Sequence, residues 1–89
     1  MKDEVAQRKI ANRLKRAKGQ LGGVIAAVEG GSSCKDVVTQ LSAVTHALNR
    51  AGFLIVSTAM ENCISDPEGT EEREGLTTEE LEKLFLALA

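Results

Sequence analysis

The stretch IANRLKRAKGQLGGVIAAV, residues 10–28, decides the fold class of this chain. Its apolar side chains recur alternately four and three residues apart, which is the spacing of one packed face of an α-helix. Glycines follow at positions 30 and 31, and glycine commonly ends a helix. We therefore predict a first helix over residues 5–29. Its apolar face consists of Ile10, Leu14, Ala17, Leu21, Val24 and Val28.

A second apolar stripe predicts a longer helix over residues 33–65. Ser33, followed three residues later by Asp36, is typical of a helix start, and Pro67 with Gly69 indicates its end. This segment is apolar on nearly all sides, so we expect it to meet other subunits. The stripe contains Val37, Leu41, Val44, Leu48, Ala51 and Ile55, with Phe53, Leu54 and Val56 beside it.

Residues 66–76 are acidic and contain glycine, and we expect a linker there. Thr77 and Glu80 form a capping-box pattern, and Leu81, Leu84, Phe85 and Leu88 share one helical face after it, so a third helix is predicted over residues 77–88. The fold class is therefore all-α, with a three-helix protomer.

The 89 residues suffice for a single domain, residues 1–89, with a modest core that oligomerisation would reinforce. The net charge is −2, but residues 8–18 contain six basic side chains and no acidic one, whereas residues 66–89 contain eight acidic and two basic side chains. This distribution favours a local patch for a polyanion.

No apolar run is long enough for a membrane span or a signal peptide, so we expect a cytoplasmic protein without a membrane partner.

Cys34 and Cys63 stand near opposite ends of the second predicted helix, 29 residues apart. A straight helix would separate them by about 44 Å. They can act as a pair only if two chains place these helices antiparallel, in a two-fold dimer. Cys34 lies in the first helical turn beside Lys35, where a thiolate is favoured, and thiolates are both nucleophiles and soft-metal ligands. In a reducing compartment such cysteines bind metal, sense redox changes or are simply buried.

Three segments together resemble the copper-sensitive operon repressor family, which includes nickel/cobalt-responsive and formaldehyde-responsive branches. They are RLKRAKGQLGGV (residues 13–24), CKDVVTQLSAVTHALNRAG (residues 34–52) and AMENCI (residues 59–64). The resemblance implies a three-helix protomer, an antiparallel helical-bundle dimer and a homotetramer formed as a dimer of dimers. It also implies a repressor that binds operator DNA and leaves it on sensing, and not an enzyme.

Two departures from the family pattern affect the predicted inducer. The resemblance implies a histidine four residues before the second cysteine, where this chain has Ala59, and a tyrosine before the first, where it has Ser33. Two cysteines without the histidine resemble the persulfide-sensing branch, the sulfur-transferase repressors. We therefore expect a redox sensor that responds to reactive sulfur species through Cys34 and Cys63, without a metal or other cofactor. The alternative is a repressor that binds Cu(I) with the same two thiolates.

The resemblance also suggests which residues contact DNA. It implies contacts from Arg13, Lys15, Arg16, Lys18, Gln20 and Arg50. A further basic position of the family is Phe53 here, and no other DNA-reading motif is present. His46 is not a family ligand position, and we interpret it as a surface or interface histidine. The alternative from a different class of function is a helical interaction module that does not bind DNA.

Overall fold

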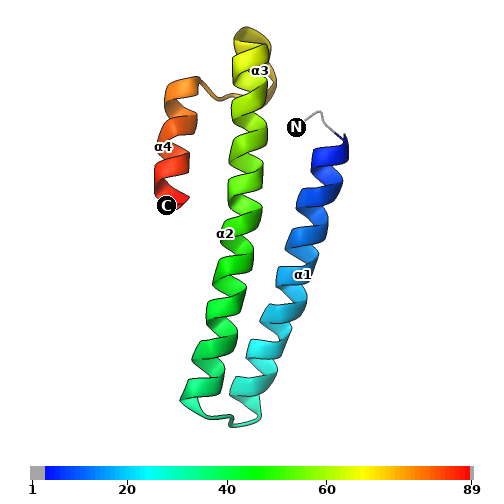
Figure 1. Ribbon diagram of the computed structural model, residues 1–89, viewed down its shortest axis with the longest axis vertical. Coiled ribbons are helices and arrows are strands. Elements are labelled where there is room, and N and C mark those ends of the chain that lie inside the picture. Colours follow the sequence, from blue (N-terminus) through cyan, green and yellow to red (C-terminus); the bar gives the residue numbers. More distant parts are fainter. Residues whose placement is uncertain (1–3, 89) are drawn as a thin grey trace.

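The computed structural model describes residues 4–88, apart from the side chains at positions 63, 67, 70 and 74. This part of the chain contains four α-helices and no strand, in an elongated shape of 52 × 25 × 15 Å. Helices α1 and α2 form a long antiparallel hairpin, and α4 packs against α2 on the side away from α1 (Figure 1). The helices are α1 (Glu4–Glu29), α2 (Cys34–Ser65), α3 (Pro67–Glu74) and α4 (Thr78–Leu88).

The two ends of the hairpin turn have the expected caps. Gly31 adopts a left-handed φ of 73°, and the Ser32 and Gly31 amides donate to the Ala27 and Val28 carbonyls at 2.9 and 3.2 Å. This is the Schellman arrangement that ends many helices at glycine. Ser33 then caps α2 by accepting a hydrogen bond from the Asp36 amide at 3.2 Å.

Helix α3 corrects the expected three-helix protomer, because it occupies the segment predicted to be a linker. Asp66 caps its first turn by accepting from the Gly69 amide at 3.2 Å, and Pro67 supplies a backbone angle suited to the helix start. Arg73 forms an ion pair with Asp66 at 3.3 Å, and Gly75 ends the helix in the left-handed conformation. This short helix has no apolar face, so the capping interactions at its two ends stabilise it.

The α1–α2 contact buries only part of each predicted apolar stripe. Residues seven apart on α1, namely Ile10, Ala17 and Val24, are buried, as are Val44, Ala51 and Thr58 on α2. The alternate residues remain exposed by 36 to 60%, in two rows: Leu14, Leu21 and Val28 on α1, and Leu41, Leu48 and Ile55 on α2. Each helix therefore has a second apolar face that the protomer does not cover.

Helix α4 is held by a small core of its own. Leu81, which is 2% exposed, packs with Val56 of α2, and Ala59, Leu76 and Leu88 surround this pair. The predicted capping box is present at its start, where Thr77 and Glu80 exchange hydrogen bonds of 3.1 and 3.4 Å. None of the described helices combines the length and apolar character needed to cross a bilayer.

Candidate nucleic-acid interface and thiol sites

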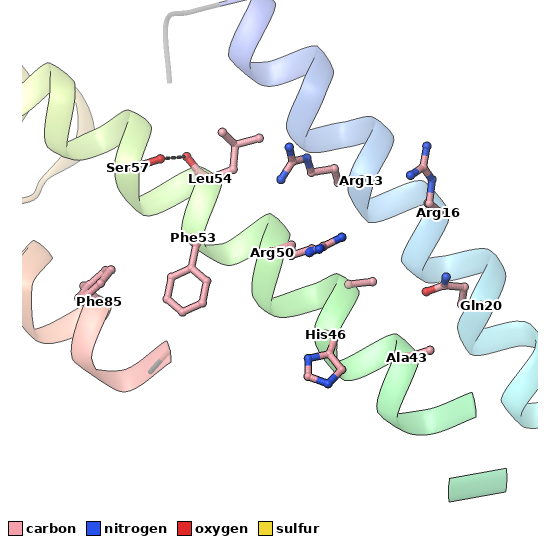
Figure 2. A pocket seen from close by; sticks show the side chains of 11 residues that line it. Arg13, Arg16, Gln20, Ala43, His46, Arg50, Phe53, Leu54, Ser57 and Phe85 are labelled. Carbon is pink, nitrogen blue, oxygen red and sulfur yellow. Dashed lines mark hydrogen bonds between the residues drawn. The ribbon is translucent and has the colours of Figure 1, made fainter. Parts of the chain in front are cut away.

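An open groove of about 980 Å³ runs along α1 and α2 and reaches α4. It gathers four of the six residues predicted to bind DNA: Arg13, Arg16 and Gln20 from α1, and Arg50 from α2. The three α1 residues share a face because they are three and four positions apart. Figure 2 shows Arg13 and Arg50 extending into the space between the two helices. The other lining residues are Ala43, His46, Ala47, Phe53, Leu54, Ser57 and Phe85.

The charge of this groove is uniformly positive. Its three arginines are all exposed, and the lining side chains that the structure describes include no carboxylate. Guanidinium groups present several N–H donors in a planar fork that suits phosphate oxygens. Such an arrangement can bind successive phosphates of a nucleic-acid backbone.

Two other predicted DNA contacts lie elsewhere on α1. Lys15 and Lys18 are exposed but do not line the groove. They are two positions from Arg13 and Arg16 respectively, a spacing that directs side chains to different helix faces. A polyanion would have to extend beyond the groove to contact them.

His46 lines the groove, which sequence reasoning did not predict. It lies one helical turn before Arg50, and this four-residue spacing indicates in the sequence that the two residues share a helix face. Farther along the groove, Phe53 of α2 and Phe85 of α4 have ring centroids 5.7 Å apart with the rings tilted by 55° (Figure 2). This aromatic pair joins α4 to the wall of the groove.

The cysteines of one chain remain far apart, as the helix length predicted. Cys34 is the first residue of α2 and is exposed, and position 63 lies two residues before the end of the same helix. Helix α2 runs without interruption between its ends (Figure 1). The side chain of Cys63 lies outside the described part of the structure. Cys34 precedes Leu41 by seven residues, so it heads the exposed row of Leu41, Leu48 and Ile55.

The described residues contain no group of three or more potential metal ligands within one protomer. Ala59, at the position where the family resemblance implied histidine, packs against the Val56–Leu81 core beneath α4. This position therefore contributes to the attachment of α4 and offers no ligand atom.

Comparison with known proteins identifies related sequences. The family model described as "Metal-sensitive transcriptional repressor" matches residues 6–88. The copper-sensing transcriptional repressor CsoR of Mycobacterium ulcerans is 42% identical over 67 residues, which cover 73% of this chain and 57% of that protein. The copper-sensing repressor RicR of Mycobacterium tuberculosis is 36% identical over 55 residues, which cover 62% of this chain and 57% of RicR.

A third relative is closer in length. The uncharacterized protein YrkD of Bacillus subtilis is 41% identical over 58 residues, which cover 64% of this chain and 92% of YrkD. The chain thus spans little more than half the length of the copper-sensing relatives. No solved structure matches it.

Proposed function

Because the chain belongs to the family of metal-sensitive transcriptional repressors, we propose that it binds operator DNA and is released by Cu(I) at a site shared between two subunits. The family comprises transcriptional repressors, not enzymes. The groove of Arg13, Arg16 and Arg50 carries the DNA-binding part of the proposal. A repressor of this kind acts on the chromosome, so we assign it to the cytoplasm.

The groove supports binding to the phosphate backbone. Each arginine that neutralises a phosphate releases condensed counterions, so the affinity falls steeply with salt. Gln20 adds an uncharged donor and acceptor beside the cations. Lys15 and Lys18 would contact phosphates that lie outside the groove. Sequence preference would come partly from the shape of the DNA.

The exposed rows support a sensor site between subunits. The row of Leu41, Leu48 and Ile55 extends from Cys34 toward the end of α2 that carries Cys63. An antiparallel α2–α2 contact through this row would bury it and bring Cys34 of one subunit toward Cys63 of the other. Two-fold symmetry gives this pairing twice. The remaining row on α1 offers a surface for joining two such dimers into a tetramer.

Cu(I) is the inducer that the relatives favour, since two of them are named as copper-sensing repressors. Two thiolates are a suitable donor set for this soft ion. Cys34 is exposed as the first residue of α2, so an ion from solution can reach its sulfur. Binding the ion would fix the spacing of the two subunits and alter the placement of their grooves.

Ala59 favours a second candidate inducer, a reactive sulfur species. The Cys34 thiolate would attack a sulfane sulfur, form a persulfide and release the shortened polysulfide. The Cys63 thiolate of another subunit would then attack the inner sulfur, expel hydrosulfide and leave an inter-subunit disulfide. This route uses two thiols and needs no third ligand at position 59.

Titrations of the reduced protein on a labelled duplex from upstream of its own gene distinguish these inducers. We expect anaerobic Cu(I) to raise the Kd for DNA at least about tenfold, within the usual range of allosteric coupling. A Cu(I) chelator should restore binding, and Cys34→Ala should prevent release while leaving the Kd of the inducer-free protein unchanged. Inorganic polysulfide is the parallel treatment, whose effect only a reductant would reverse.

Each result of these titrations tests a different part of the proposal: the inducer, the thiol site or the binding to DNA. Release by polysulfide but not by Cu(I) would replace copper with reactive sulfur as the inducer. Release of the Cys34→Ala variant by either treatment would exclude the inter-subunit thiol site. Salt-insensitive or absent DNA binding by the reduced protein would contradict the repressor function.

A further inference from the structure

His46 shares the arginine groove, but the proposed repressor function assigns it no role. It is exposed and lies one turn from Arg50 on the face of α2 that lines the groove. It is also the only histidine in the chain. Histidine is the side chain whose charge ordinarily changes between pH 5 and 8.

In the part of the chain that the structure describes, the charged groups that line the groove with His46 are all cationic. Helix α1 contributes Arg13 and Arg16, helix α2 contributes Arg50, and the α4 contribution is the uncharged Phe85. Among the described residues that line the groove, none is a carboxylate that could pair with an imidazolium. A bound phosphate backbone would supply the missing negative charge. Protonation and phosphate binding therefore favour each other, and such coupling is reciprocal.

We propose that His46 is a further phosphate contact of the groove, which acts in its protonated form and makes DNA affinity increase as the pH falls toward 6. This inference rests on the proposed DNA-binding function. The protonated imidazole presents two N–H donors, whereas the neutral ring has one donor and one acceptor. Only the protonated form adds positive charge to the three arginines, and only that form displaces a further counterion from DNA.

The salt dependence of DNA binding at pH 6 and pH 8 tests this role, with the inducer-free, reduced protein and the labelled duplex. Each engaged histidine should steepen the slope of log Kd against log salt by about 0.9 at the lower pH. Between 50 and 200 mM salt, this is an extra weakening of about 3.5-fold per histidine. Two variants fix the charge: His46→Gln is always neutral and His46→Lys is always cationic at these pH values.

We expect His46→Gln to show the shallow slope at both pH values and His46→Lys the steep one. Calorimetry in two buffers of different ionisation enthalpy should detect proton uptake when the wild-type protein binds DNA near pH 7, and none with either variant. Equal slopes for the wild type at the two pH values, or undiminished proton uptake in His46→Gln, would overturn the inference alone. Failure of the wild type and both variants to bind DNA would overturn it together with the proposed function.

Discussion

Arg16 and Arg50 reach one groove from different helices, so their contributions to DNA binding can be tested singly. Each guanidinium is exposed in the free protein and would form charge-assisted hydrogen bonds to phosphate. We expect Arg16→Ala or Arg50→Ala to weaken binding by roughly tenfold and to reduce the magnitude of the salt slope by about 1 for each phosphate interaction that the substitution removes. Fluorescence anisotropy with the labelled duplex over a salt series measures both quantities.

Lys83→Ala is the matched control, because it removes an exposed cation from α4 outside the groove. It should leave the slope unchanged. If it weakened binding as much as Arg50→Ala, general charge attraction rather than the groove would explain the affinity.

The sequence allowed most of this site to be predicted at the level of single residues. The basic character of residues 8–18 and the family resemblance identified Arg13, Arg16, Gln20 and Arg50, which the structure brings together. For His46 the sequence predicts only a surface or interface histidine, since its position matches no family ligand. Its place in the groove depends on which faces of α1 and α2 are turned toward each other. Tertiary packing sets this orientation, so the sequence pattern of one helix does not reveal it.

At the scale of elements, the structure confirms the three helices predicted from apolar periodicity to within one residue at each end. Helix α3 was missed because its sequence, PEGTEERE, has no apolar face for such a pattern to reveal. Proline at its start and glycine after its end are signals of a short helix. In the sequence Pro67 indicates the end of the preceding helix, and in the structure it also begins α3.

The stability of α3 should depend on Asp66, which caps the helix and pairs with Arg73. We expect Asp66→Ala to cost about 1 kcal/mol of local stability, the usual loss for an N-cap. Hydrogen exchange at the α3 amides should speed up about fivefold as a result. Arg73→Ala breaks only the exposed ion pair and should change these rates much less. Equal effects of the two variants would assign the stability of α3 to the ion pair and not to the cap.

At the scale of the whole molecule, the uncovered apolar rows are the feature with the largest energetic consequence. A hairpin with large side chains exposed along both helices leaves much apolar surface in water. Burial of these rows between subunits would therefore stabilise the protein, and its unfolding midpoint should depend on concentration. The sequence pattern indicates that the helices carry more apolar surface than one protomer covers. It does not indicate which part of that surface packs within the protomer and which part meets another subunit.

Leu48 is the residue that tests the proposed subunit arrangement most directly. An antiparallel pair that joins Cys34 to Cys63 has its two-fold axis midway between these positions, beside residues 48 and 49. Leu48, which is 48% exposed, would then meet Leu48 of the other subunit. We expect Leu48→Asp to place two carboxylates on the axis and to halve the mass of the oligomer in sedimentation equilibrium at micromolar concentration. Leu86→Asp, at an exposed apolar position on α4 outside both rows, should leave the oligomer intact. An unchanged mass for Leu48→Asp would place the subunit contact elsewhere and keep the two cysteines apart, since no other register of α2 against α2 brings them together.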